Sequence, residues 1–119
     1  MTKSIADTMV QLMIGVVNGP NGTAQGRFSL PNRIQVAAKT GTAQLTDGRG
    51  GYYKDRFFHS FTGFFPSYAP RFIILLYTND PQGVKYASET LNKTFLNLVH
   101  FLIDYYAIPP DRGTSLTQL

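Results

Sequence analysis

The sequence of 119 residues contains no cysteine, few charged residues (15%) and no long apolar run. Without cysteine the chain can form no disulfide, no thiolate metal site and no cysteine nucleophile. The absence of cysteine does not identify the cellular compartment. Its longest uninterrupted apolar run, residues 72–77, is far shorter than the roughly 20 residues that a membrane span needs. No signal-peptide pattern follows Met1. Composition therefore indicates one compact globular domain.

The net charge of +4 is unevenly distributed. Its whole excess of basic residues lies in residues 1–56, where Arg27, Arg33 and Lys39 follow one another with no acidic residue between them. Such a strip suits a carboxylate or phosphate partner, but it is more often a solvated surface. The charge is too small to predict nucleic-acid binding by itself.

Hydrophobic periodicity predicts a helix near each end of the chain. Residues 4–18 carry an apolar stripe that we expect to pack in the core, with Ser4 and Asp7 as a start signal resembling a capping box. Residues 86–106 carry a second stripe, which ends before two consecutive prolines. The polar residues 112–119 are expected to form a flexible tail.

Three strands are predicted between these helices. The first starts with the alternation of residues 34–39, which places Lys39 on the face opposite Ile34 and Val36. We expect it to close soon after Lys39 and to be followed by a mobile hairpin connection over residues 45–56, which contain several glycines.

The second and third strands, residues 57–65 and 71–78, are apolar on both faces, so we expect both faces to be covered. Short connections favour antiparallel neighbours. The predicted fold class is α+β: a helix, a three-stranded antiparallel sheet and a long C-terminal helix. Two helices cover about one face of such a sheet, and the outer edge of strand 71–78 has no evident partner. Part of the sheet is therefore expected to lie outside this chain.

The strongest chemical signal is the run Lys39-Thr40-Gly41-Thr42. Lys39 supplies positive charge, and the hydroxyls of Thr40 and Thr42 can bind a carboxylate. Gly41 removes a side chain where a ligand backbone could lie along the strand. A free backbone N–H in this run could stabilise an oxyanion. The tripeptide alone is also compatible with an ordinary strand end.

Other kinds of site are not supported by the sequence. A phosphate-binding loop would need glycine at the positions of Arg33 and Ala38. His59 and Ser60 are neighbours on a strand, so they point to opposite faces and cannot form a nucleophile–base pair. His59 and His100 are interpreted as structural residues. The acidic residues are scattered singly, which predicts neither a metal site nor a carboxylate pair.

Residues 36–44, VAAKTGTAQ, resemble the third active-site motif of penicillin-binding protein transpeptidases. The similarity extends over roughly residues 4–111 and is highest to class B, the monofunctional elongation and division enzymes. Four further segments carry it: residues 9–19 (MVQLMIGVVNG), 22–24 (GTA), 59–66 (HSFTGFFP) and 106–111 (YAIPPD).

This resemblance implies a fragment of the five-stranded β-lactamase/transpeptidase-like fold. Residues 1–111 would be the C-terminal portion of a penicillin-binding transpeptidase domain, and the first two strands of that domain would pair with residues 71–78. The parent protein would be anchored in the inner membrane, with this domain on the extracytoplasmic side. The resemblance implies no cofactor, no metal and no nucleic-acid partner.

It also implies roles for the motif residues in acyl transfer through a serine. Lys39 would support the electrostatics and proton network around that serine, and Gly41 would let the substrate strand lie close. The hydroxyls of Thr40 and Thr42 would bind the terminal carboxylate of a D-Ala-D-Ala stem peptide or of a β-lactam. The backbone N–H of Thr42 would donate to the oxyanion.

The sequence departs from the family in what it lacks. No serine is followed three residues later by lysine, so the S-x-x-K motif with the acylated serine is absent. The family's second motif, S-x-N or Y-x-N upstream of K-T-G, is absent as well: no residues match S-x-N, and residues 77–79 match Y-x-N only in letters because they follow the K-T-G motif at a strand end. The isolated chain is therefore expected to be catalytically inactive.

Two alternatives remain open. The chain could be a non-catalytic module that binds carboxylates, peptides or another protein, or a small basic domain that binds anions or RNA through residues 27–39. Whatever the function, we expect self-association through the exposed strand 71–78, by edge pairing or a swapped helix.

Overall fold

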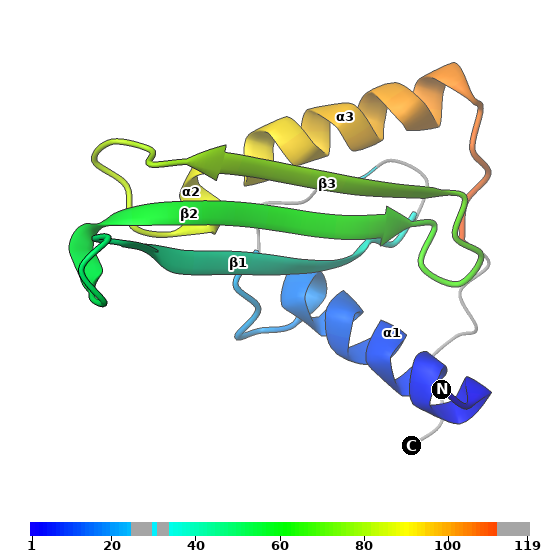
Figure 1. The fold of residues 1–119 in the computed structure, drawn as a ribbon. Helices are drawn as coiled ribbons and strands as arrows, with labels where there is room; N and C mark the ends of the chain where they lie inside the picture. The colour runs from blue at the N-terminus through cyan, green and yellow to red at the C-terminus, as the bar shows by residue number, and fades with distance from the viewer. Residues whose placement is uncertain (25–29, 31–33, 112–119) are drawn as a thin grey trace.

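The computed structural model describes residues 1–24, 30 and 34–111. Helix α1 (Lys3–Asn18) is followed by strands β1 (Ala37–Thr46), β2 (Tyr52–Phe65) and β3 (Phe72–Asn79) and by helices α2 (Ala87–Thr90) and α3 (Asn92–Tyr105). The strands form one antiparallel sheet in the order β1–β2–β3 (Figure 1). The predicted α+β architecture is confirmed. Predictions for the tail and for Arg27 and Arg33 lie outside the described residues.

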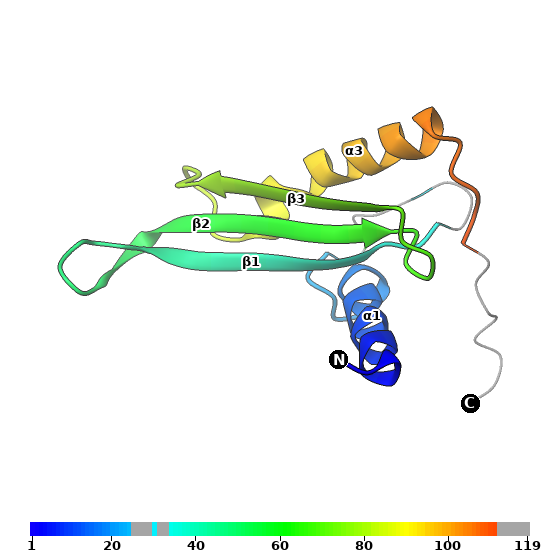
Figure 2. The same cartoon turned by 45° about the vertical axis from the view of Figure 1, so that its right-hand side comes forward.

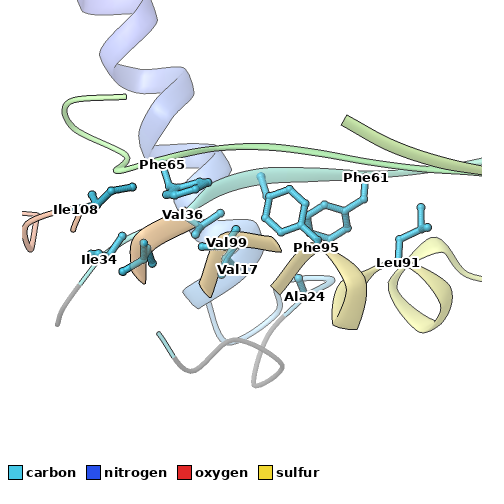
Figure 3. Packing of buried hydrophobic residues seen from close by; sticks show 12 residues of the cluster. Val17, Ala24, Ile34, Val36, Phe61, Phe65, Leu91, Phe95, Val99 and Ile108 are labelled. Atoms are coloured by element: carbon cyan, nitrogen blue, oxygen red, sulfur yellow. The ribbon is translucent and has the colours of Figure 1, made fainter. Parts of the chain in front are cut away.

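One face of the sheet carries the core (Figure 3). Phe61 and Phe65 of β2 are fully buried there against Phe95 and Val99 of α3, and the ring centroids of Phe61 and Phe95 are 4.5 Å apart. The buried cluster comprises Val17, Ala24, Ile34, Val36, Ala38, Phe61, Phe65, Leu91, Phe95, Val99, Ile103 and Ile108.

The other face of β3 is open to solvent among the described residues. Ile73, Leu75 and Tyr77 are 76%, 63% and 68% exposed. The cover predicted for both faces is therefore absent from the outer face of β3 within the described residues, because α3 packs over only one face. This agrees with the prediction that two helices cover about one face of the sheet. The central position predicted for residues 57–65 is confirmed by the strand order.

The β1–β2 hairpin is longer than predicted and extends beyond the end of β3 (Figure 2). Instead of closing soon after Lys39, β1 continues to Thr46, and β2 already starts at Tyr52. The predicted loop of residues 45–56 shrinks because Asp47 closes a tight turn. Its carboxylate accepts hydrogen bonds from the backbone N–H groups of Arg49 (2.8 Å) and Gly51 (2.9 Å).

Helix α1 has the predicted extent but not the predicted burial. Its C-terminal end lies near β1, whereas its N-terminal end runs away from the sheet (Figure 1). Ile14 and Val17 are buried, but Met9 and Leu12 of the predicted core stripe are 48% and 63% exposed. The N-cap is Thr2 rather than Ser4, because the Thr2 hydroxyl accepts the backbone N–H of Ile5.

The predicted C-terminal helix is divided in two. Leu91 separates α2 from α3 with φ −106° and ψ −20°, away from ideal helical values. Helical hydrogen bonding nevertheless includes Leu91, since its carbonyl accepts the N–H of Phe95 at 2.9 Å. This break positions α2 against β1 and β2, beside the K-T-G motif.

Candidate functional site

The K-T-G run lies in the middle of β1 rather than at its end. Lys39, Thr40 and Gly41 pair with Thr62, Phe61 and Ser60 of β2. In the described part of the chain, β1 is an edge strand of the sheet. An edge strand directs backbone N–H and C=O groups outward, where an extended peptide can pair with them.

Strand alternation divides the motif between the two faces of the sheet. Ala38, Thr40 and Thr42 share the core face, whereas Lys39 and Gly41 share the opposite face. Lys39 thus lies opposite the buried Val36, as predicted. Gly41 faces Ser60, and a Cβ at this position would collide with the Ser60 hydroxyl. A residue other than glycine would have to displace that side chain.

Lys39 is exposed, and its ammonium group donates to the Thr40 carbonyl at 2.5 Å. It borders an open hollow of about 350 Å³ between β1 and the end of α1, together with Leu12, Val16 and residues 19–23. A cation at the rim of a hollow can attract an anionic group.

The two threonine hydroxyls have different partners. Thr40 Oγ1 lies 3.1 Å from Thr23 Oγ1, in the turn that follows α1. Thr42 Oγ1 accepts the backbone N–H of Ala87, at the start of α2, at 3.2 Å. Since a hydroxyl has one proton and two lone pairs, Thr42 keeps its proton for a further acceptor such as a carboxylate.

His59 is fully buried and faces Thr42 across the β1–β2 ladder, while Ser60 faces Gly41 on the other side. The two residues therefore lie on opposite faces, as predicted. His59 Nε2 is 2.9 Å from the Lys85 carbonyl, and Nδ1 is 3.0 Å from Thr90 Oγ1. The structural role predicted for His59 is thus to fasten the segment that leads into α2 onto β2.

Sequence reasoning missed the contacts of Thr23 and His59 with the motif region. Thr23 lies in the GTA segment that carries the family resemblance, and the sequence alone gives it no role. The signal for His59 would have been a buried strand histidine two residues from Phe61, which points to a partner without identifying it.

Charged groups farther along the hairpin form their own contacts. Arg56 bonds to Asp80 at the end of β3, and this hydrogen bond and the Asp80 charge raise the pKa of the guanidinium. The backbone N–H groups of Arg49 and Gly51 lower the pKa of the Asp47 carboxyl below its usual range. Both sites are solvent-exposed and stabilise the hairpin rather than the motif.

No group of three or more metal-ligating side chains occurs within residues 1–24, 30 and 34–111. None of the helices in these same ranges is long and apolar enough to span a bilayer.

A family model described as the penicillin binding protein transpeptidase domain matches residues 1–100. The chain therefore belongs to the penicillin-binding protein transpeptidase domain family.

Named relatives agree with this assignment. A probable peptidoglycan D,D-transpeptidase PbpC of Pseudomonas aeruginosa is 30% identical over 113 residues, which are 93% of this chain and 19% of that protein. A peptidoglycan D,D-transpeptidase FtsI homolog of Nephroselmis olivacea is 40% identical over 80 residues, or 66% of this chain and 11% of that protein. The chain thus spans less than a fifth of the length of these relatives.

Solved structures show the same fold. Penicillin-binding protein 3 of Mycobacterium tuberculosis, complexed with ampicillin, superposes with a TM-score of 0.73 at 26% identity, covering 94% of this chain and 26% of that one. The transpeptidase domain of Burkholderia pseudomallei penicillin-binding protein 3 gives a TM-score of 0.70 at 26% identity, covering 87% of this chain and 30% of that one.

Proposed function

We propose that residues 1–111 form the C-terminal portion of a peptidoglycan D,D-transpeptidase domain and supply its substrate-binding strand. The observation that carries this proposal is the K-T-G motif in the middle of an edge strand, with Lys39 beside an open hollow. A stem peptide ending in D-Ala-D-Ala pairs with the outer edge of β1 as an added strand. Thr40 and Thr42 donate hydrogen bonds from their hydroxyls to its terminal carboxylate.

The reaction is acyl transfer through a serine outside this chain. The serine oxygen attacks the carbonyl of the penultimate D-Ala and expels the terminal D-Ala, which leaves an ester. An amine of a neighbouring stem peptide then attacks this ester, forms the cross-linking amide and releases the serine. The Thr42 N–H donates to the oxyanion, and Lys39 supports the proton transfers around the serine.

The same proposal includes the cellular location of the parent protein and its reaction with β-lactams. The parent is anchored in the inner membrane, with this domain on the extracytoplasmic side where peptidoglycan is built. β-Lactams acylate the intact domain, which the ampicillin complex of the similar penicillin-binding protein 3 supports.

Labelling with a fluorescent penicillin tests the proposal. The full polypeptide that the gene encodes should be labelled covalently, and Lys39→Ala should slow this labelling by at least an order of magnitude. Lys54→Ala, a lysine change in the exposed hairpin, is the matched control and should leave it unchanged. The isolated chain should remain unlabelled, and covalent uptake by it would contradict the predicted inactivity.

A non-catalytic binding module is the second candidate, favoured by the absence of S-x-x-K from the 119 residues. Such a module would bind N-acetyl-D-Ala-D-Ala saturably and stereospecifically without acylation. Titration against the L,L-dipeptide distinguishes the candidates: stereospecific binding by the full polypeptide together with absent labelling would favour the module.

A further inference from the structure

The Thr23–Thr40 contact joins two residues that come from different elements. Thr40 belongs to β1, and Thr23 belongs to the turn that follows α1, yet their Oγ1 atoms are 3.1 Å apart. Both are hydroxyls, so either can be the donor. The direction of this hydrogen bond decides what Thr40 can offer to a ligand.

The turn holds Thr23 in place from both sides. The fully buried Ala24 donates its N–H to the carbonyl of Val16 at 3.1 Å. Gly22 packs so closely on the end of α1 that a Cβ there would collide with the Val16 carbonyl. The position of Thr23 relative to β1 is therefore set by backbone contacts rather than by its own side chain.

We propose that Thr23 is a positioning residue for carboxylate recognition by Thr40, an inference that rests on the proposed function. When Thr23 donates to Thr40, the single proton of Thr40 is free to point at a carboxylate oxygen. When Thr40 donates to Thr23, it presents only lone pairs, which repel an anion. A bound carboxylate selects the first arrangement, and each hydrogen bond in the resulting chain strengthens the next.

The ester of the same ligand provides the key comparison. N-acetyl-D-Ala-D-Ala and its methyl ester differ in the negative charge that Thr40 is to bind and in one methyl group. Both are titrated against the full polypeptide by following the Thr40 methyl NMR signal. In the Thr23→Val variant, which keeps the shape and removes the hydroxyl, we expect acid-over-ester selectivity to fall about fivefold, the effect of losing one net hydrogen bond.

Two control variants separate this role from simple packing. Thr23→Ser retains a hydroxyl and should restore the selectivity, whereas Thr94→Val, an exposed threonine change on α3, should not alter it. Slow hydrogen exchange of the Ala24 amide verifies that the turn is intact in each variant. Equal weakening of acid and ester in Thr23→Val, or unchanged selectivity, would overturn the proposal.

The outcome remains informative if the proposed function itself fails. Should the unsubstituted protein bind neither ligand, the proposed function is contradicted, and the Thr40 side-chain rotamer populations from scalar couplings become the readout. Unchanged Thr40 populations in Thr23→Val would overturn the positioning role as well, whereas altered populations that return in Thr23→Ser would support it.

Discussion

Single side chains connect the K-T-G strand to the start of the C-terminal helices. Thr42 of β1 accepts the N–H of Ala87 in α2. His59 of β2 contacts the Lys85 carbonyl, just before α2, and the Thr90 hydroxyl at its end. The Lys85 carbonyl can only accept, so His59 donates to it through its Nε2–H. Removing this imidazole leaves a carbonyl without a donor in a part-buried site, which costs more than the bond itself contributes.

The variant His59→Phe tests this connection. Its ring can still stack near Phe57, whose centroid lies 6.1 Å from that of His59, but both hydrogen bonds are lost. We expect the free energy of unfolding to fall by roughly 1–3 kcal/mol and the Ala87 amide to exchange faster. Urea unfolding and hydrogen exchange measure the two effects. His100→Phe, at a half-buried site on α3, is the control, and an equally large effect there would contradict the assignment.

At the scale of elements, the hairpin turn depends on an ionised carboxylate. The folded pKa of Asp47 lies below its usual value of 3.8, because the N–H groups of Arg49 and Gly51 bind the charged form. The ionised group thus stabilises the turn above the unfolded pKa, and this stabilisation is lost as the pH falls through the folded pKa. The Gly51 amide signal should therefore titrate only in acid.

An NMR pH titration measures this dependence. Asp47→Asn, which cannot ionise, should remove the acid transition of Gly51 while leaving the rest of the sheet folded. A Gly51 signal that stays constant between about pH 5 and about pH 2 would contradict the role of the charge.

The packing of α3 on the sheet depends on a glycine in β2. A Cβ on Gly63 would lie 2.7 Å from Phe95 Cζ and 3.0 Å from both the Ala37 carbonyl oxygen and Ala38 Cβ. Phe95 is fully buried and cannot yield. Gly63→Ala should therefore lower the unfolding free energy by roughly 1–3 kcal/mol, measured by denaturant titration. Gly15→Ala is the matched control, since nothing lies within 4 Å of its Cβ, and in helix α1 it should stabilise by up to about 1 kcal/mol.

Periodicity predicted the elements because each helix and strand repeats its apolar positions locally. It failed for the hairpin, where glycines indicated a loop although Asp47 needs only a few residues to close the turn. It also could not predict the contacts of Thr23 with Thr40 or of His59 with Lys85. These join residues 17 and 26 positions apart, and only the folded sheet brings them together.

At the scale of the whole molecule, the C-terminal segment is fastened to the sheet by one carboxylate. Asp111 Oδ2 accepts the N–H groups of Gln35, before β1, and of Ser67, after β2, each at 3.0 Å. Asp111→Ala leaves the Gln35 N–H without this acceptor, while the Ser67 N–H keeps its second acceptor, the Gln35 carbonyl at 3.0 Å, and the change should cost roughly 1–3 kcal/mol in a denaturant titration. Asp104→Ala, on an exposed residue of α3, should stay within about 0.5 kcal/mol. Equal losses in the two variants would contradict the role of Asp111.

We expect the exposed face and free edge of β3 to set the association state of the isolated chain. Ile73, Leu75 and Tyr77 form an apolar row on the outermost described strand, whose unpaired backbone groups can receive another strand. We expect the sedimentation coefficient of this chain to rise with concentration, and Leu75→Lys to shift the distribution toward monomer because it places a charge in the row. Leu12→Lys, on the equally exposed apolar surface of α1, is the control and should leave association unchanged. A chain that sediments as a monomer at high concentration, or one in which Leu12→Lys acts as strongly as Leu75→Lys, would show that β3 is not the associating surface.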